Sequence, residues 1–344
     1  MPKSATRTII IGALILGLFV GFRYYQKIFS ANVMTPEAKA VDFFVPTGAD
    51  YRQIGQKLLE EKLISDPEAF HWVAEQMNYP RHVKPGRYIL TDGMSTRELI
   101  QLLRSGRQTP VKYSFVKFRN KEQLAAHTAK QLEMSERDLL DVMNDSEFLG
   151  KHNGLTPSTA MTVFIPNTYE LYWNVSAKEF FERMFKEYKR FWNEERNAKR
   201  KKFGLNRLEV MTLASIVEEE TNQNDEKTRV AGVYLNRIRK RMPLQADPTV
   251  KFAVGDFTLR RILNKHLQVD SPYNTYLYPG LPPGPICTPS IPSIDAVLNG
   301  ERHAYYYFCA KIDGSGYHKF SETIREHEAY ANQYRQMLNQ RGIK

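Results

Sequence analysis

The chain has 344 residues, of which 49 are lysine or arginine and 38 are aspartate or glutamate, giving a formal net charge of +11. The length suggests two domains at roughly 150 residues each, and a hydrophobic content of 42% excludes a mostly disordered chain. Two cysteines exclude a disulfide scaffold and a four-cysteine zinc site. The glycine-rich motifs of P-loop and Rossmann nucleotide enzymes are absent from the sequence, which argues against both classes.

The excess of positive charge fits a polyanionic partner, such as nucleic acid, an anionic membrane surface or an acidic cell-wall polymer. Part of it is concentrated in residues 196–202, where five of seven residues are cationic. No nucleic-acid-binding motif accompanies this run, so we interpret it as a solvated helix end and expect no nucleic-acid partner.

The N-terminal segment predicts a membrane anchor. Residues 8–22 form an uncharged, largely apolar run of 15 residues with basic residues on both sides. A bilayer span needs about 20 residues. Residues 23–29 can extend the 15-residue run to this length, because their cations can snorkel to the membrane surface and their tyrosines suit the membrane interface. We therefore expect a short cytoplasmic tail at 1–7 and an uncleaved transmembrane anchor at 8–29. A cleaved signal peptide is the alternative, although no clean pattern of small residues follows the run.

Both the uncleaved anchor and the cleaved signal peptide predict that the rest of the chain is exported. We expect a single-pass protein of the cytoplasmic (inner) membrane with an extracytoplasmic or periplasmic body. Cys287 and Cys309 then lie in an oxidising compartment. The sequence leaves open whether they pair or remain two separate thiols.

The exported body is predicted to be α+β and to contain two domains. The first, at residues 38–110, has the expected order strand, helix, helix, strand, helix, at 41–45, 50–61, 68–77, 87–90 and 95–106. It carries no paired reactive groups, so we interpret it as a binder or spacer. The second, at 111–344, begins with a strand at 112–118 and helices at 121–133, 135–149 and 178–202. Aromatic residues repeat at helical spacing in the last helix, which is typical of core packing.

Three consecutive glutamates end a predicted helix at residues 207–221. At about 100° per residue, Glu219 points away from the apolar face into solvent, whereas Glu218 and Glu220 lie on the two flanks of that face. A carboxyl at the edge of an apolar face is partly desolvated, which raises its pKa and lets it act as an acid near neutrality. Glu218 and Glu220 face different ways, so they cannot form one paired-carboxylate site. The helical periodicity excludes Glu219 as the desolvated acid but does not choose between Glu218 and Glu220.

The segment Ala-Ser-Ile-Val-Glu-Glu-Glu-Thr at 214–221 resembles the Ala-Ser-Ile-x-Glu-x-Glu-x motif of the endolytic murein transglycosylases, the YceG-like family. Further segments resemble this family in chain order, at 233–237, 244–250, 271–276, 280–286, 307–308 and 318–320. Asn167 stands where the family has aspartate, and Cys287 stands where a small alanine is usual. The resemblance covers nearly the whole chain, including the anchor and a LysM-like module at 38–110.

The resemblance implies nonhydrolytic cleavage of the β-1,4 bond between N-acetylmuramic acid and N-acetylglucosamine in nascent peptidoglycan. The C6 hydroxyl of muramic acid attacks C1 and leaves a 1,6-anhydro end. One carboxyl suffices because the nucleophile belongs to the substrate, whereas a hydrolase needs a second carboxylate. The implied partners are peptidoglycan glycan strands, the cytoplasmic membrane and, as candidates, cell-wall synthases. Ending strand elongation is a candidate role, and no cofactor is implied.

The second glutamate of the family motif maps to Glu220, which the resemblance makes the catalytic residue, and Glu218 is carried over as a supporting group. The other candidate substrate-binding or supporting residues are Gln245, Asp247, Tyr273, Asn274 and Tyr276. Prolines bracket the first two, and the last three offer aromatic and amide groups suited to N-acetyl sugars. Turn hydrogen bonding is an equal alternative for each of the five.

Competing interpretations predict different products or none. A noncatalytic, membrane-anchored peptidoglycan binder would leave the glycan uncut, and a true glycoside hydrolase would leave a hydrolysed end. His318 and His327 have no partner at metal-ligand spacing, so we interpret both as structural and expect no metal.

Overall fold

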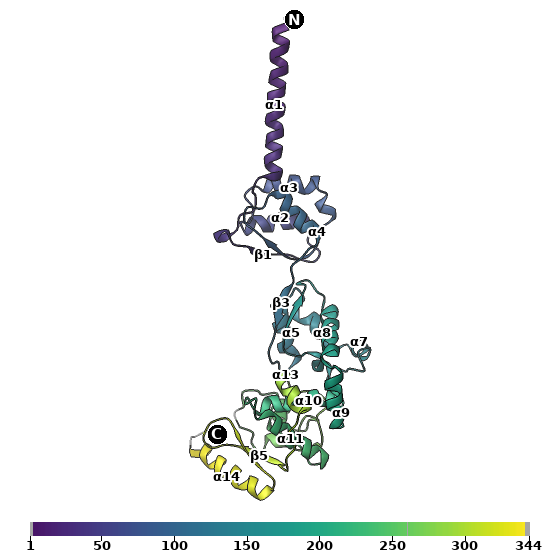
Figure 1. The fold of residues 1–344 in the computed structure, drawn as a ribbon, viewed down its shortest axis with the longest axis vertical. Helices are drawn as coiled ribbons and strands as arrows, with labels where there is room; N and C mark the ends of the chain where they lie inside the picture. The colour runs from purple at the N-terminus through teal and green to yellow at the C-terminus, as the bar shows by residue number, and fades with distance from the viewer. Residues whose placement is uncertain (1–2, 260, 341–344) are drawn as a thin grey trace. The chain divides into compact units, whose positions relative to one another are not determined.

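The computed structural model of the chain describes residues 3–259 and 261–340. These residues form two compact units, each with helices and a short antiparallel sheet, so the predicted α+β class is confirmed (Figure 1). The small unit consists of the residues up to Tyr113 together with Gln131–Glu133 and Glu170–Val175. The large unit consists of Ser114–Lys130, Met134–Tyr169 and the residues from Ser176 onward. The domain bounds and the LysM-like character expected from the sequence stay predictions.

Helix α1 spans Lys3–Phe29 and contains the apolar segment noted in the sequence. Most of its large apolar side chains from Ile10 onward are exposed, with exposed fractions from 43% at Val20 to 75% at Leu18. Within the described ranges, no helix combines the length and the apolar character that crossing a bilayer requires. The transmembrane anchor predicted at residues 8–29 is therefore not confirmed and stays a prediction.

The small unit has the element order expected from the sequence. Its elements are β1 (Val41–Val45), α2 (Tyr51–Glu60), α3 (Pro67–Gln76), β2 (Gly86–Leu90) and α4 (Thr96–Ser105). The two strands pair antiparallel, with Phe43 opposite Tyr88. Asp50 and Ser95 form capping boxes that start α2 and α4, which explains why the helix starts could be located from the sequence. The apolar faces of the helices and sheet enclose one core that includes Phe43, Leu58, Phe70, Tyr88 and Leu103.

The chain then continues through β3 (Val111–Ser114), α5 (Lys121–Ala129), α6 (Glu136–Asn144), α7 (Ser146–Gly150), β4 (Thr168–Leu171), α8 (Ala177–Phe191) and α9 (Glu194–Lys202). The helices predicted at 135–149 and 178–202 are each broken in two. Asp145 and Asn193 accept hydrogen bonds from the backbone amides that follow them, and such a cap starts a new helix. The aromatic residues of α8 are mostly buried, as predicted for core packing, and the basic run ends α9 with Lys201 and Lys202 exposed.

The last part of the large unit contains α10 (Arg207–Glu220), α11 (Lys227–Arg239), α12 (Asp247–Val254), α13 (Ile291–Leu298), β5 (Tyr307–Ala310), β6 (His318–Ser321) and α14 (Ile324–Gln340). Helix α10 is buried from Val210 to Val217 and packs against α11 and α13. β5 and β6 pair antiparallel, and α14 packs against both (Figure 1). Short 3-10 helices occur at Pro36–Ala38, Tyr79–Arg81, Ala160–Val163 and His266–Gln268.

The two cysteines are free thiols in the structure. Cys287 is buried beside α10, where its sulfur lies 3.5 Å from the carbonyl oxygen of Ser215. Cys309 is half-buried in β5. Of the two alternatives left open by the sequence, the structure favours two separate thiols.

Candidate active site

Glu220 ends α10 at the junction of two cavities. The aromatic cavity, of about 480 Å³, is lined by rings that include Tyr234, Tyr307, Phe308, His318 and His327. The basic cavity, of about 1130 Å³, is lined by cations that include Lys251, Arg261, Lys265 and Arg335. Glu220, Asp247, Tyr276 and Tyr334 line both cavities. A chain-like ligand that filled the two cavities would therefore pass Glu220.

Glu220 is a desolvated carboxyl. Burial raises its pKa to about 8, assisted by the negative charge of Asp247 and opposed by Tyr234 and Arg237. Tyr234, on α11, donates its hydroxyl hydrogen to the Glu220 carboxylate. At neutral pH Glu220 therefore holds a proton that it can give to a bound ligand, as predicted for a carboxyl at the flank of the apolar face.

Glu218 lies on the other flank of α10 and has the opposite electrostatics. It accepts hydrogen bonds from the hydroxyls of Ser290 and Ser293 and from the ammonium group of Lys227, 3.1 Å away. Burial would raise the pKa of Glu218, but these hydrogen bonds and the charge of Lys227 outweigh it and lower the pKa below its usual value. Glu218 is therefore ionised at neutral pH and joins α10 to α11 and α13, so the environment leaves Glu220 as the acid.

Glu219 does not point into solvent, and the prediction made from helical periodicity is wrong. Its side chain is only 12% exposed and forms ion pairs with Lys117 at 2.6 Å and Arg119 at 3.2 Å. Both cations come from the irregular segment after β3, which covers the polar side of α10. Helical periodicity shows where the apolar face points, but it carries no information about a distant segment that packs on the opposite face.

Gln245 and Asp247 both line the aromatic cavity, and Asp247 also lines the basic one. The backbone before them is held by Arg237, whose guanidinium donates to the carbonyl oxygens of Pro243 and Leu244 at 3.1 and 2.8 Å. Desolvation raises the pKa of Asp247, although a hydrogen bond from the hydroxyl of Tyr276, at 2.6 Å, opposes the shift.

Of the three candidates between 273 and 276, only Tyr276 lines the two cavities. Asn274 is fully buried, and its amide donates to the carbonyl oxygens of Leu267 and Val269, both at 2.9 Å. Tyr273 packs on Phe252, with ring centroids 4.7 Å apart. The structure therefore gives Asn274 the turn-holding function that the sequence left as an alternative, and it places Tyr273 outside the lining of both cavities.

Several residues of the site were not singled out from the sequence. Tyr234 and Arg237 lie in the segment 233–237, whose resemblance to the family was the only available signal. Tyr334 and Arg335 come from α14, and no sequence signal pointed to them. His318 bonds to Glu226 at 2.7 Å, as a structural residue does, but it also lines the aromatic cavity. Within the described ranges, no group of three or more His, Cys, Asp or Glu side chains is placed to hold a metal ion.

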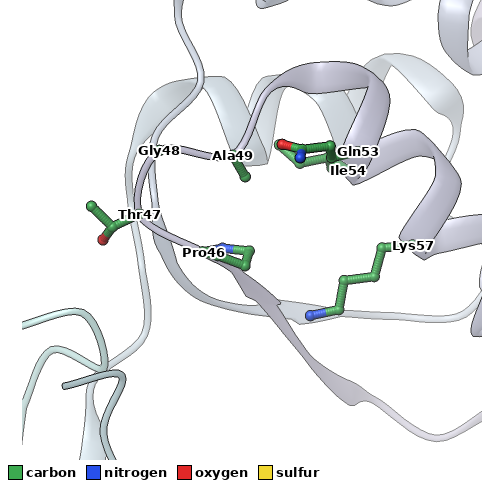
Figure 2. Close-up of a pocket in the computed structure, with 7 residues that line it drawn as sticks. All are labelled: Pro46, Thr47, Gly48, Ala49, Gln53, Ile54 and Lys57. Carbon is green, nitrogen blue, oxygen red and sulfur yellow. The ribbon is translucent and has the colours of Figure 1, made fainter. Parts of the chain in front are cut away.

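The small unit has a cavity of its own, of about 310 Å³. It is lined by the loop after β1 and by the first turns of α2, including Pro46, Ala49, Ile54 and Lys57 (Figure 2). The Lys57 ammonium donates to the carbonyl oxygen of Phe44 at 2.7 Å. Among the residues that the structure describes, those lining this cavity include no carboxyl, imidazole or thiol, so they offer no group for acid–base catalysis near neutrality.

Comparison with known proteins identifies the family. The sequence model of the YceG-like family matches residues 43–333. The chain belongs to the YceG-like family. An endolytic murein transglycosylase of Bacillus subtilis (strain 168) is 29% identical over 335 residues, which cover 92% of this chain and 91% of that protein.

Two other comparisons agree with this assignment. An endolytic murein transglycosylase of Streptococcus pneumoniae (strain D39) is 26% identical over 308 residues, which cover 80% of this YceG-like chain and 55% of that longer protein. A crystal structure of a YceG-like protein from Listeria monocytogenes superposes with a TM-score of 0.55 at 29% identity, covering 85% of this chain and 99% of that one.

Proposed function

We propose that this YceG-like protein is an endolytic murein transglycosylase. It cuts the β-1,4 bond between N-acetylmuramic acid and N-acetylglucosamine within peptidoglycan strands and leaves a 1,6-anhydro end. The observation that carries the proposal is the protonated Glu220 carboxyl at the junction of two cavities. The names of the relatives in Bacillus and Streptococcus support the substrate class.

Glu220 serves this reaction as acid and then as base. Its carboxyl protonates the glycosidic oxygen as the bond from that oxygen to C1 of muramic acid breaks. The resulting carboxylate takes the proton of the C6 hydroxyl while O6 bonds to C1, which restores the acid and closes the anhydro ring. No water is consumed. Tyr234 holds the carboxylate in place, and Asp247 and Tyr276 form the cavity wall beside it.

The mass of the product tests this function. Purified protein is incubated with glycan strands, and the new ends are analysed by mass spectrometry. A transglycosylase gives ends that lack one water relative to those from a hydrolase, and a noncatalytic binder gives no new ends. Asp247 lies in the same cavities and would be the second carboxylate of a hydrolase. Hydrolysed ends would therefore overturn the transglycosylase and point to Asp247.

The pKa of Glu220 predicts the pH dependence of cleavage. The reaction starts from the protonated acid, so we expect kcat/KM to change little from about pH 6 to pH 7.5 and to fall about tenfold per pH unit above the Glu220 pKa of about 8. Initial rates of anhydro-end formation across this pH range measure the fall in kcat/KM on the alkaline side. A loss of rate near pH 5 with full activity at pH 10 would contradict the assignment of Glu220 as the acid.

Tyr234→Phe is the matched variant for this profile. The hydroxyl of Tyr234 stabilises the ionised form of Glu220 and so lowers its pKa. Removing the hydroxyl should therefore raise that pKa and move the alkaline limb to higher pH. If kcat/KM fell at the same alkaline pH in both proteins, the fall would reflect the titration of a group other than Glu220.

We further propose that α1 holds the chain at the cytoplasmic (inner) membrane, with the rest of the chain in the extracytoplasmic or periplasmic space. The uncharged run at 8–22, its basic flanks and the exposed apolar side chains of α1 support this location. The proposed partners are the membrane and cell-wall synthases. The proposed role is to end the elongation of glycan strands. The small unit, which we propose to be LysM-like, would act as a spacer.

Cell fractionation tests this location. The full-length chain should be recovered with membranes, whereas a chain lacking residues 1–30 should be soluble and still cut glycan, because no proposed catalytic residue lies in the deleted segment. Full-length protein recovered mainly in the soluble extracytoplasmic fraction and starting near residue 31 would show a cleaved signal instead.

A further inference from the structure

The basic cavity has more cations than carboxylates among the described residues that line it. Among the described residues, Lys251, Lys265 and Arg335 line this cavity and none has a carboxylate within ion-pair distance. The acidic residues of the same cavity contribute little opposing charge. Glu219 is already paired with two cations of its own, and Glu220 is protonated at neutral pH. Asp247 also lines the cavity, but it is one carboxyl against four cations, and desolvation raises its pKa.

The aromatic cavity differs in character. The guanidinium of Arg237, which lines this cavity, donates hydrogen bonds to backbone carbonyl oxygens. Many of the other lining groups are tyrosine, phenylalanine and histidine rings. Desolvation and the positive charges of Arg237 and Arg335 lower the pKa of His327, so that imidazole is neutral at pH 7. Aromatic faces suit neutral sugar rings. One side of Glu220 is therefore suited to sugar alone, and the other side is suited to an anion as well.

We propose that the basic cavity binds the carboxylates of the stem peptides on the muramic acid residues, so that the enzyme selects peptide-bearing over peptide-free glycan. This inference rests on the proposed function. In peptide-bearing strands the lactyl carboxyl of muramic acid is consumed in the amide bond to the peptide, so the free carboxylates of these strands belong to the peptides. A volume of about 1130 Å³ exceeds the roughly 300–1,000 Å³ of ordinary small-molecule sites, which leaves room for peptide beside sugar.

The size of the expected preference follows from the number of contacts. An exposed ion pair contributes about a two- to fivefold effect, and cations that share one cavity act together. We therefore expect kcat/KM for peptide-bearing strands to exceed that for peptide-free strands by about tenfold. Added salt should reduce the ratio because partly exposed charges are screened.

Three preparations of the same glycan strands separate charge from bulk. The first keeps its stem peptides. The second has lost them to an amidase, and the lactyl carboxylates that this cleavage frees are capped as methylamides. The third keeps its peptides with every carboxylate capped as a methylamide. Initial rates of anhydro-end formation are measured for the full chain and for two double variants. Lys251→Gln/Lys265→Gln removes two cations of the basic cavity, and Lys186→Gln/Lys201→Gln removes two exposed cations that line neither cavity.

The expected result is fast cleavage of the charged strands, about tenfold slower cleavage of the capped and peptide-free strands, and a ratio that falls toward one in Lys251→Gln/Lys265→Gln but not in the control. Equal rates on charged and capped strands would overturn the inference, as would a ratio unchanged by the cavity variant. Both results leave the transglycosylase intact. If none of the three preparations is cut, the proposed function itself fails, and the inference fails with it.

Discussion

Replacing Glu220 with glutamine is expected to lower the rate of anhydro-end formation by about 10²–10⁴-fold, which is the usual contribution of a general acid–base group. Glutamine has nearly the same shape and can still accept the hydrogen bond from Tyr234, but it has no proton of suitable acidity to give to the glycosidic oxygen. Because the side chain is neutral at pH 7 in both proteins, the fold should be retained. Cleavage of purified glycan and a thermal unfolding curve measure the two expectations.

Glu122→Gln is the matched control, because Glu122 is an exposed carboxyl on α5 that lines neither cavity. It should cut glycan at the normal rate. If Glu220→Gln kept near-normal activity, the acid would have to be another carboxyl. Asp247 would then be the next candidate, since its pKa is also raised by desolvation, whereas the pKa of Glu218 is lowered.

The sequence was sufficient where structure depends on local signals. Capping residues such as Asp50, Ser95 and Asn206 placed the starts of helices, and the apolar face of α10 placed Glu220 at a desolvated flank. The same local rules located the small unit's strands, since turns flank them on both sides. Each of these predictions depends on residues within a few positions of one another.

The errors arise where distant segments meet. Glu219 is covered by Lys117 and Arg119, about a hundred positions away in sequence, so helical periodicity alone placed it in solvent. Asn274 turns inward to backbone carbonyls, although its amide is equally able to bind a sugar. The part of the site supplied by α14 could not be inferred at all, because an amphipathic helix gives no sign of which cavity it will border.

Replacing Glu218 with glutamine is expected to destabilise the large unit by about 3–5 kcal/mol, the usual cost of leaving one member of a buried ion pair without its partner. The side chain of Lys227 is only 5% exposed, and Glu218 is its ion-pair partner at 3.1 Å. Glutamine can still accept hydrogen bonds from Ser290 and Ser293, so the loss comes mainly from the uncompensated ammonium charge. Urea unfolding at pH 7 measures the change in the free energy of unfolding.

The double variant Glu218→Gln/Lys227→Met tests the cause, because it removes both charges at similar volume and should recover most of the lost stability. The pH dependence gives a second check. The folded-state pKa of Glu218 is lower than the ordinary value of 4.5, so its stabilising effect is present above that value and is lost as the pH falls through the folded-state pKa. The gap between wild type and Glu218→Gln should therefore close in acid. A double variant no more stable than the single one would show that the loss does not come from the uncompensated charge of Lys227.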